Sequence, residues 1–126
     1  MRSRSILAGI AVLLMTGPAP AQRGGDVYVV MGLGSATCAY FADLNRRDPR
    51  NEVAFSDWAQ GFMSGINWKL NADPSTRRFQ RNLAATSIQS QRVYIRRYCD
   101  QRPSDVYVAA VYDLFNSLPE IPPDRL

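Results

Sequence analysis

The amino-acid sequence predicts an all-α domain, a small bundle of about four helices stapled by one disulfide. Three observations support this prediction: a long apolar stripe with helical spacing, two cysteines far apart in the chain, and glycine or proline residues between the periodic segments. A short N-terminal extended strand is compatible with it. A chain of 126 residues suits one domain.

The first 21 residues have the order of a secretory signal peptide. Arg2 and Arg4 precede an uncharged apolar run over residues 6–15, and small residues follow at 19–21. A membrane-spanning helix needs about 20 apolar residues, and this run has about half of that length. We therefore expect a cleaved signal, no membrane span after cleavage, and a periplasmic or secreted protein.

Cleavage after Ala21 leaves about 105 residues and lowers the formal net charge from +4 to +2, because Arg2 and Arg4 are removed. Proteins that bind nucleic acid or a membrane surface usually carry a much larger basic excess. We therefore expect neither nucleic acid nor a membrane surface as the partner.

Cys38 and Cys99 are the only cysteines, and export exposes them to an oxidising compartment. The chain has no histidine, so a zinc site of the usual kind is not expected, and the spacing is not that of a Cys-x-x-Cys redox pair. We predict a structural disulfide that closes a loop of about 62 residues and contributes about 4 kcal/mol to the free energy of unfolding.

Residues 22–34 are predicted to be a flexible or extended arm, in which Val27–Val30 have strand-like composition. The helical domain spans residues 35–118. Its first helix begins after a cap at Ser35 or Thr37, ends near Arg47, and buries Cys38, Phe41 and Ala42.

The second predicted helix runs from about Glu52 to Lys69. Gly61 and Gly65 lie four residues apart on its flank, so we expect another helix to approach closely there. Its inner side is a single stripe at helical spacing, formed by Phe55, Trp58, Ala59, Phe62, Met63, Ile66 and Leu70.

A polar connection over residues 71–85, with one irregular turn, leads to the third helix, which is capped by Thr86 or Ser87 and continues through Cys99. Its expected inner residues are Ile88, Gln91, Ile95, Tyr98 and Cys99, with Arg92, Arg96 and Arg97 outward. The fourth helix spans Asp105 to Leu118 and buries Tyr107, Ala110, Val111, Leu114 and Leu118. Residues 119–126 form a proline-rich tail.

No arrangement of residues predicts catalysis. Without histidine there is no Ser-His or Cys-His pair, and ordinary solvation or helix-dipole roles account for the carboxylates. The Gly32-x-Gly34 pattern could belong to a dinucleotide loop, but its third glycine position is Thr37, so a plain turn is favoured. We expect a protein that is not an enzyme, with no cofactor and no metal.

The candidate partner-binding residues are Trp68 and five arginines, namely Arg77, Arg78, Arg81, Arg92 and Arg96. Together the arginines could form one cationic surface for an acidic partner. The simpler alternative, a solvated face, is favoured. The aromatic and glycine cluster around Trp58 is more often core than ligand pocket, and Trp68 falls off the main stripe.

Three segments carry a family resemblance: Gly32-Leu33-Gly34-Ser35-Ala36-Thr37-Cys38, then Trp58-Ala59-Gln60-Gly61-Phe62-Met63-Ser64-Gly65-Ile66-Asn67, and Tyr98-Cys99-Asp100-Gln101-Arg102-Pro103. In this order they resemble a group of short exported proteobacterial proteins. The group is remotely similar to periplasmic acid-stress chaperones of the HdeA type and to immunity proteins of type VI secretion. The resemblance implies a helical, single-disulfide, non-enzymatic protein, and it transfers no functional site residue.

Three functions therefore remain open, the third being a purely structural role in the cell envelope. The first is a periplasmic protein-binding domain, with immunity-type inhibition of a cell-wall-targeting effector as one form. The second is an acid-activated periplasmic chaperone of the HdeA type. The expected partner is accordingly an effector or a client protein, and a homodimer is compatible with either function.

Overall fold

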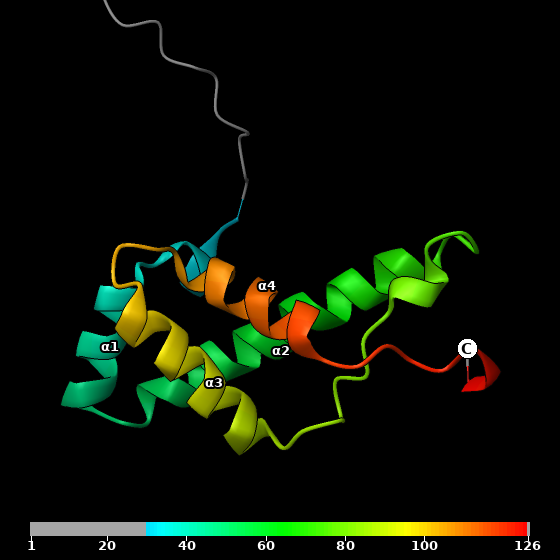
Figure 1. Ribbon diagram of the computed structural model, residues 1–126. Helices are drawn as coiled ribbons and strands as arrows, with labels where there is room; N and C mark the ends of the chain where they lie inside the picture. Colours follow the sequence, from blue (N-terminus) through cyan, green and yellow to red (C-terminus); the bar gives the residue numbers. More distant parts are fainter. Residues whose placement is uncertain (1–29, 126) are drawn as a thin grey trace, which may run out of the picture.

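The computed structural model describes residues 30–125. Within that range the chain forms four α-helices, and it contains no β-sheet, which confirms the all-α prediction (Figure 1). The helices are α1 (Cys38–Arg47), α2 (Asn51–Asn71), α3 (Ile88–Gln101) and α4 (Tyr107–Ser117). Three short 3-10 turns accompany them: η1 (Gly32–Ser35), η2 (Arg77–Phe79) and η3 (Pro123–Arg125). The predicted signal peptide, residues 1–21, lies outside the described residues.

The predicted arm, residues 22–34, lies mostly outside the described residues too. Its last residues, Gly32–Gly34, belong to η1, and Gly34 is buried. They are therefore a packed turn rather than an extended segment.

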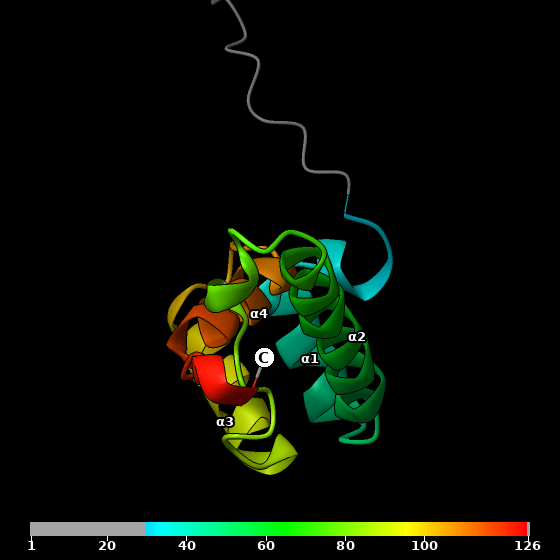
Figure 2. The ribbon, with the colours of Figure 1, turned by 90° about the vertical axis from the view of Figure 1, so that its right-hand side faces the viewer.

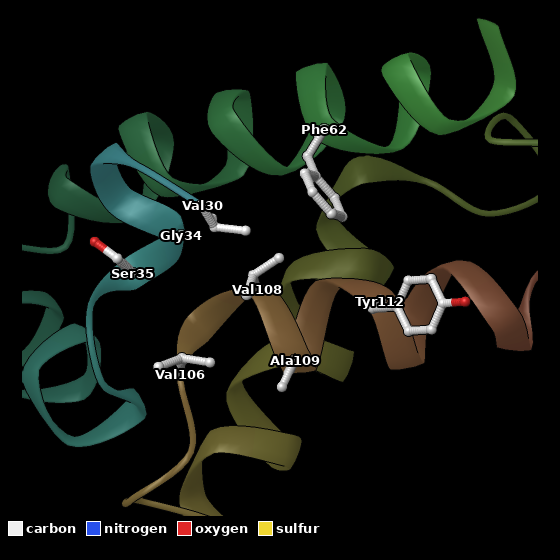
Figure 3. Close-up of a pocket in the computed structure, with 8 residues that line it drawn as sticks. All are labelled: Val30, Gly34, Ser35, Phe62, Val106, Val108, Ala109 and Tyr112. Carbon is white, nitrogen blue, oxygen red and sulfur yellow. The ribbon is translucent and has the colours of Figure 1, made fainter. Parts of the chain in front are cut away.

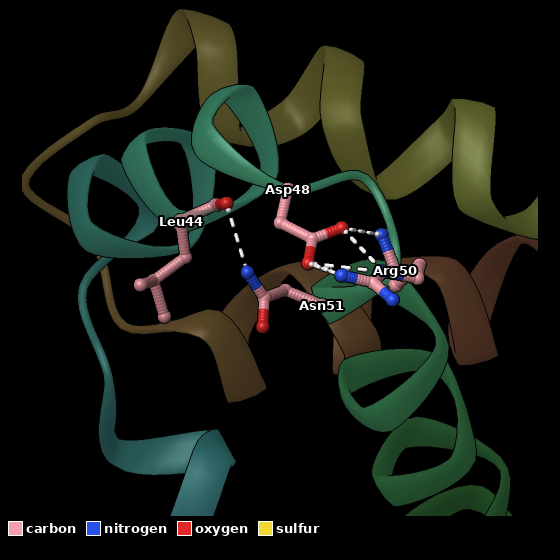
Figure 4. A network of polar contacts seen from close by, with 4 residues as sticks. All are labelled: Leu44, Asp48, Arg50 and Asn51. Carbon is pink, nitrogen blue, oxygen red and sulfur yellow. Dashed lines mark hydrogen bonds and ion pairs between the residues drawn. The ribbon is translucent and has the colours of Figure 1, made fainter.

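The helix ends follow from local hydrogen bonding. Thr37 accepts a hydrogen bond from the Tyr40 amide (3.1 Å) and begins α1, and Ser87 accepts one from the Ser90 amide (3.1 Å) and begins α3. At the end of α1, the Leu44 carbonyl accepts from the Asp48 amide and from Asn51 Nδ2, both at 3.0 Å (Figure 4). Side chains and turns thus satisfy backbone groups that every helix end leaves unpaired.

In the same turn, Arg50 donates hydrogen bonds to the Asp48 carboxylate from its backbone amide and its guanidinium, at 2.7–3.0 Å (Figure 4). These hydrogen bonds hold the pKa of the Asp48 carboxyl below its usual value. The turn between α1 and α2 is therefore stabilised by a charged contact that needs an ionised Asp48.

The disulfide joins Cys38 to Cys99, as predicted, with an S–S distance of 2.09 Å and a Cα–Cα distance of 4.7 Å. It connects the first residue of α1 to the last turn of α3. Figure 2 shows α1 and α2 on one side of the molecule and α3 with α4 on the other. The disulfide therefore links the two halves.

Backbone hydrogen bonds reinforce the same junction. The Cys38 and Ala39 amides donate to the carbonyls of Asp105 (2.8 Å) and Pro103 (2.9 Å), and the Tyr107 amide donates to Ala36 (2.7 Å). The segment before α1 thus lies antiparallel to the segment before α4, with a bridge between Thr37 and Val106.

Three aromatic rings from three helices form the centre of the core. Phe41, Phe55 and Tyr107 contact one another with ring centroids 4.8–5.0 Å apart in tilted or edge-to-face geometry. Burial raises the pKa of the Tyr107 phenol far above its usual value, so its hydroxyl remains neutral. The rest of the core consists of Cys38, Ala59, Met63, Ile95, Cys99, Ala110, Val111, Leu114, Phe115 and Leu118.

The C-terminal tail is held against the connection between α2 and α3. The Ile121 amide donates to the Gln80 carbonyl (3.0 Å), and the Asn82 amide donates to the Pro119 carbonyl (2.8 Å). Asn67 of α2 fixes the same connection, because its side chain donates to the Arg81 carbonyl (2.8 Å) and accepts from the Arg81 amide (2.9 Å). The polar connection is therefore an ordered part of the fold.

Several predicted positions differ in the structure. Ile88 was expected on the inner side of α3 but is 42% exposed, because it is the first residue of α3 and precedes the part of the helix that meets the core. Ala42 is only partly buried, and Arg92 and Arg96, expected to point outward, are also partly buried. A Cβ built on Gly61 or on Gly65 would meet nothing within 4 Å, so the prediction of a close helix approach at this ridge was wrong.

We predict that the disulfide contributes a large share of the stability. Cys38→Ser or Cys99→Ser opens a loop with a sequence separation of 61 and leaves a buried polar group in the core. The cost is about 4 kcal/mol in the loop-entropy model. Thermal unfolding should show a melting temperature lowered by more than about 10 °C.

The double variant is the control, because one substitution already breaks the bond. Its melting temperature should match that of the less stable single variant. Two thiols that react with an alkylating reagent in the native protein would contradict the bridge.

Candidate functional site

The site begins at η1, where two glycines bring the main chain against α2. Gly32 has φ +72°, a left-handed conformation that side chains rarely adopt, and Gly34 lies under the Trp58 indole. A Cβ on Gly34 would lie 2.1 Å from Trp58 and 2.8 Å from Val30, so only glycine fits there. The absence of a side chain at residue 34 therefore decides how η1 sits on α2.

Trp58 in turn stacks on Phe62, one helical turn further along α2, with ring centroids 5.2 Å apart and planes inclined by 14°. Its edge also faces Tyr107 of the core, at 6.2 Å. The predicted aromatic stripe of α2 is thus real, and Trp58 joins the core to η1.

Between η1, α2 and α4 the surface forms a groove of about 750 Å³ (Figure 3). We call it the apolar groove. No lining side chain carries a formal charge, and Ser35 donates its hydroxyl to the Gly32 carbonyl (2.9 Å). The lining residues are Val30, Gly34, Ser35, Phe62, Val106, Val108, Ala109 and Tyr112.

A second, shallower hollow of about 430 Å³ adjoins it along α2 and shares Phe62 with it. It lies over the open glycine ridge, where Gly61 and Gly65 expose the helix backbone. Phe62 therefore separates two apolar depressions on the same side of α2. Trp68, one turn beyond Gly65, is 80% exposed and lines neither of them.

The candidate arginines do not form a single surface. Arg96 pairs with Glu52, in the first turn of α2, whereas Arg77 donates to the carbonyl of Asn71, its last residue (3.4 Å). The two contacts are about 28 Å apart along a straight helix of this length. The arrangement thus differs from the one cationic surface that the sequence allowed.

The other three candidate arginines lie in separate surroundings. Arg78 lies over the Phe79 ring, 4.7 Å from its centroid. Arg81 donates to the Leu118 carbonyl (3.3 Å) and lies 3.5 Å from Glu120, so it holds the tail. Arg92 is partly buried on α3, and its Nε has no hydrogen-bond partner among residues 30–125.

Two tyrosines of α3 bind carboxylates next to α4. Tyr94 donates to Asp113 (2.7 Å) and Tyr98 donates to Asp105 (2.9 Å). The hydrogen bond to Asp113 raises the pKa of Tyr94, and burial raises the pKa of Tyr98. Both phenols are therefore neutral donors at physiological pH.

The described residues, 30–125, contain no group of three or more histidine, cysteine, aspartate or glutamate side chains placed to hold a metal ion. Within the same range no helix combines the length and apolarity needed to cross a membrane. What this part of the chain offers is an open apolar surface.

Sequence reasoning missed the apolar groove, although part of the signal was present. Val108, Ala109 and Tyr112 face away from the buried stripe of α4, so that helix is apolar on two sides. An α-helix that is apolar all round is usually covered on all sides. Nothing in the sequence of η1 indicated that this turn would form one wall of the groove.

Comparison with known proteins adds no relative: no family model, no curated protein and no solved structure matches this chain.

We predict opposite effects for alanine at two glycines. Gly34→Ala forces Trp58 and Val30 aside and should destabilise the protein by about 1–3 kcal/mol. Gly61→Ala, in the open middle of α2, should stabilise it by about 0.5–1 kcal/mol, because alanine is the better helix former. Urea unfolding followed by circular dichroism measures both. Equal changes in the two variants would contradict the packing of η1 on Trp58.

Proposed function

We propose that this chain is a non-enzymatic exported domain that binds another protein in the periplasm through the apolar groove. The observation that carries the proposal is the open side of α4. One side of this helix is core, and the other leaves Tyr112 53% exposed beside Val108 and Ala109. An exposed aromatic side chain beside aliphatic ones in a groove is a feature of protein interaction sites.

The chemistry of the groove indicates the kind of contact. Its lining is aliphatic and aromatic, and the nearby carboxylates Asp105 and Asp113 already accept hydrogen bonds from tyrosines of α3. An apolar helix face or an extended apolar segment suits such a groove. A charged small molecule would find no counter-charge in its lining.

A stapled domain also suits tight binding. The disulfide and the backbone contacts at Cys38 hold η1 and the start of α4 together before any partner arrives. A preformed groove loses less conformational entropy on binding than a flexible one. Immunity-type inhibition of a cell-wall-targeting effector is one concrete form of this function, and a neighbouring gene for a secreted amidase would favour it.

The second candidate is an acid-activated chaperone. It is favoured by carboxylates whose ionised form stabilises turns of the fold. Hydrogen bonds from Arg50 lower the pKa of Asp48, and those from Ser75 lower the pKa of Asp73. Protonation of such groups weakens the native state, and a loosened groove would then present its apolar lining to client proteins.

We predict that Tyr112→Asp weakens partner binding at least tenfold, because it places a charge in the apolar groove and removes its exposed aromatic ring, the type of side chain that dominates many interfaces. The partner is captured from periplasmic extract at neutral pH, identified by mass spectrometry, and its dissociation constant is measured with the purified proteins. Tyr40→Asp is the matched control, since Tyr40 is equally exposed on α1 and does not line the groove.

The dissociation constant of the Tyr40→Asp control should remain within about twofold of that of the unaltered protein. Equal loss in both variants, or no specific partner at all, would remove the support for the groove as the binding site.

We predict that stability falls at acid pH in a defined direction. The pKa of Asp48 is lowered on folding, so its contribution is present above the unfolded value of 3.8 and is lost as the pH falls below it. Urea unfolding between pH 5 and pH 2 should show this decline, and Asp48→Asn should remove part of it, while the part due to Asp73 remains. Light scattering of an aggregating client at pH 2–3 decides the chaperone function, which fails if the protein leaves aggregation unchanged.

A further inference from the structure

The N-terminal end of the described chain lies in the apolar groove. Val30, the first described residue, lines the groove together with Val108, Ala109 and Phe62, and Figure 3 shows its side chain directed into the space between α2 and α4. No charged side chain lines that space. The main chain that precedes Val30 therefore starts from the groove itself.

Val30 is held in this place by the packing of η1. A Cβ on Gly34 would lie 2.8 Å from Val30 Cγ1, so the valine lies against the bare backbone of Gly34, next to the Trp58 indole. Met31 follows with extended backbone angles (φ −111°, ψ 166°). The point at which the preceding segment meets the groove is thus defined by close contacts.

The three residues before Val30 have the composition that an apolar groove accepts, Val27-Tyr28-Val29. In extended backbone, residues two apart share a face and lie about 7 Å from each other. Tyr28 would then share the face of Val30. It is the one large aromatic among residues 22–29.

We propose that residues 27–29 of this chain cover the apolar groove, with Tyr28 packed on Val108 and Ala109. The segment is tethered at Val30, so its effective concentration at the groove is about millimolar or higher. It thereby shields the open side of α4 in the unbound protein.

This inference rests on the proposed function in one respect, because it makes the segment a regulator of the same groove. A protein partner must displace Tyr28 before it binds. Its apparent affinity is reduced by the fraction of molecules in which the groove is free. The segment thus sets a threshold of affinity that weak or non-specific apolar partners do not reach.

The direct test is nuclear Overhauser spectroscopy of the exported chain, residues 22–126. We expect contacts between the Tyr28 ring and the methyl groups of Val108 and Ala109. A sample that mixes isotope-labelled and unlabelled protein separates contacts within one chain from contacts between two copies. Contacts seen only between copies, or none between residues 27–29 and the groove, would overturn the proposal.

A second measurement uses variants of the same chain. Tyr28→Ser should increase the fluorescence of a bound apolar dye, anilinonaphthalene sulfonate, at least threefold, because the groove is uncovered. Arg23→Ser, in the same segment but polar, should leave the fluorescence unchanged. Equal fluorescence in the two variants would overturn the proposal.

These experiments test the cover over the groove separately from the proposed binding function. If Tyr28 contacts the groove and no partner is captured, the cover stands and the binding function fails. If a partner is captured, Tyr28→Ser should lower its dissociation constant by about threefold or more while Arg23→Ser does not. A partner that binds both variants with the affinity of the unaltered chain would overturn the regulatory role.

Discussion

The junction between Cys38 and Cys99 is the constraint on which the rest of the structure depends. The disulfide ties the start of α1 to the last turn of α3, and the amides of Cys38, Ala39 and Tyr107 close hydrogen bonds across the same place. Because α4 begins immediately beyond it, the junction sets the direction in which α4 crosses α2. The aromatic centre of Phe41, Phe55 and Tyr107 lies next to this junction, because Phe41 is one turn beyond Cys38 and the Tyr107 amide donates to Ala36.

The apolar groove results from the way in which the two ends of the core are covered by other segments. Met63, Ala110 and Leu114 are buried between α2 and its partners, while the tail and the 80–82 segment cover the far end. η1 covers the near end, held by the contact of Gly34 with Trp58. Between these two covers the outer side of α4 stays partly exposed, and that surface is apolar because α4 carries Val108, Ala109 and Tyr112 there. The same packing that completes the core thus leaves the candidate binding surface open.

Charged residues in this protein mainly form contacts that hold neighbouring segments together. Arg50 stabilises the turn after α1, Arg81 holds the tail, and Arg96 joins α3 to the start of α2 through Glu52. Each of these contacts fixes one segment of the chain against another or shapes a turn, so their shared effect is on geometry. The five candidate arginines, although close in sequence or on one helix, therefore end at different places.

The helical class and the buried stripe of α4 could be predicted from the amino-acid sequence because helical periodicity is a local property, and the cysteine pairing could be predicted because the chain has only two cysteines. The sequence also limited each cap to two residues, Ser35 or Thr37 for α1 and Thr86 or Ser87 for α3, and the structure selects Thr37 and Ser87. The tertiary structure alone decided that Gly61 and Gly65 face open space, that Arg77 and Arg96 lie at opposite ends of α2, and that Gly34 lies under Trp58. These outcomes depend on which surfaces meet across long stretches of chain, and a pattern within one segment carries no information about the segment that will lie against it.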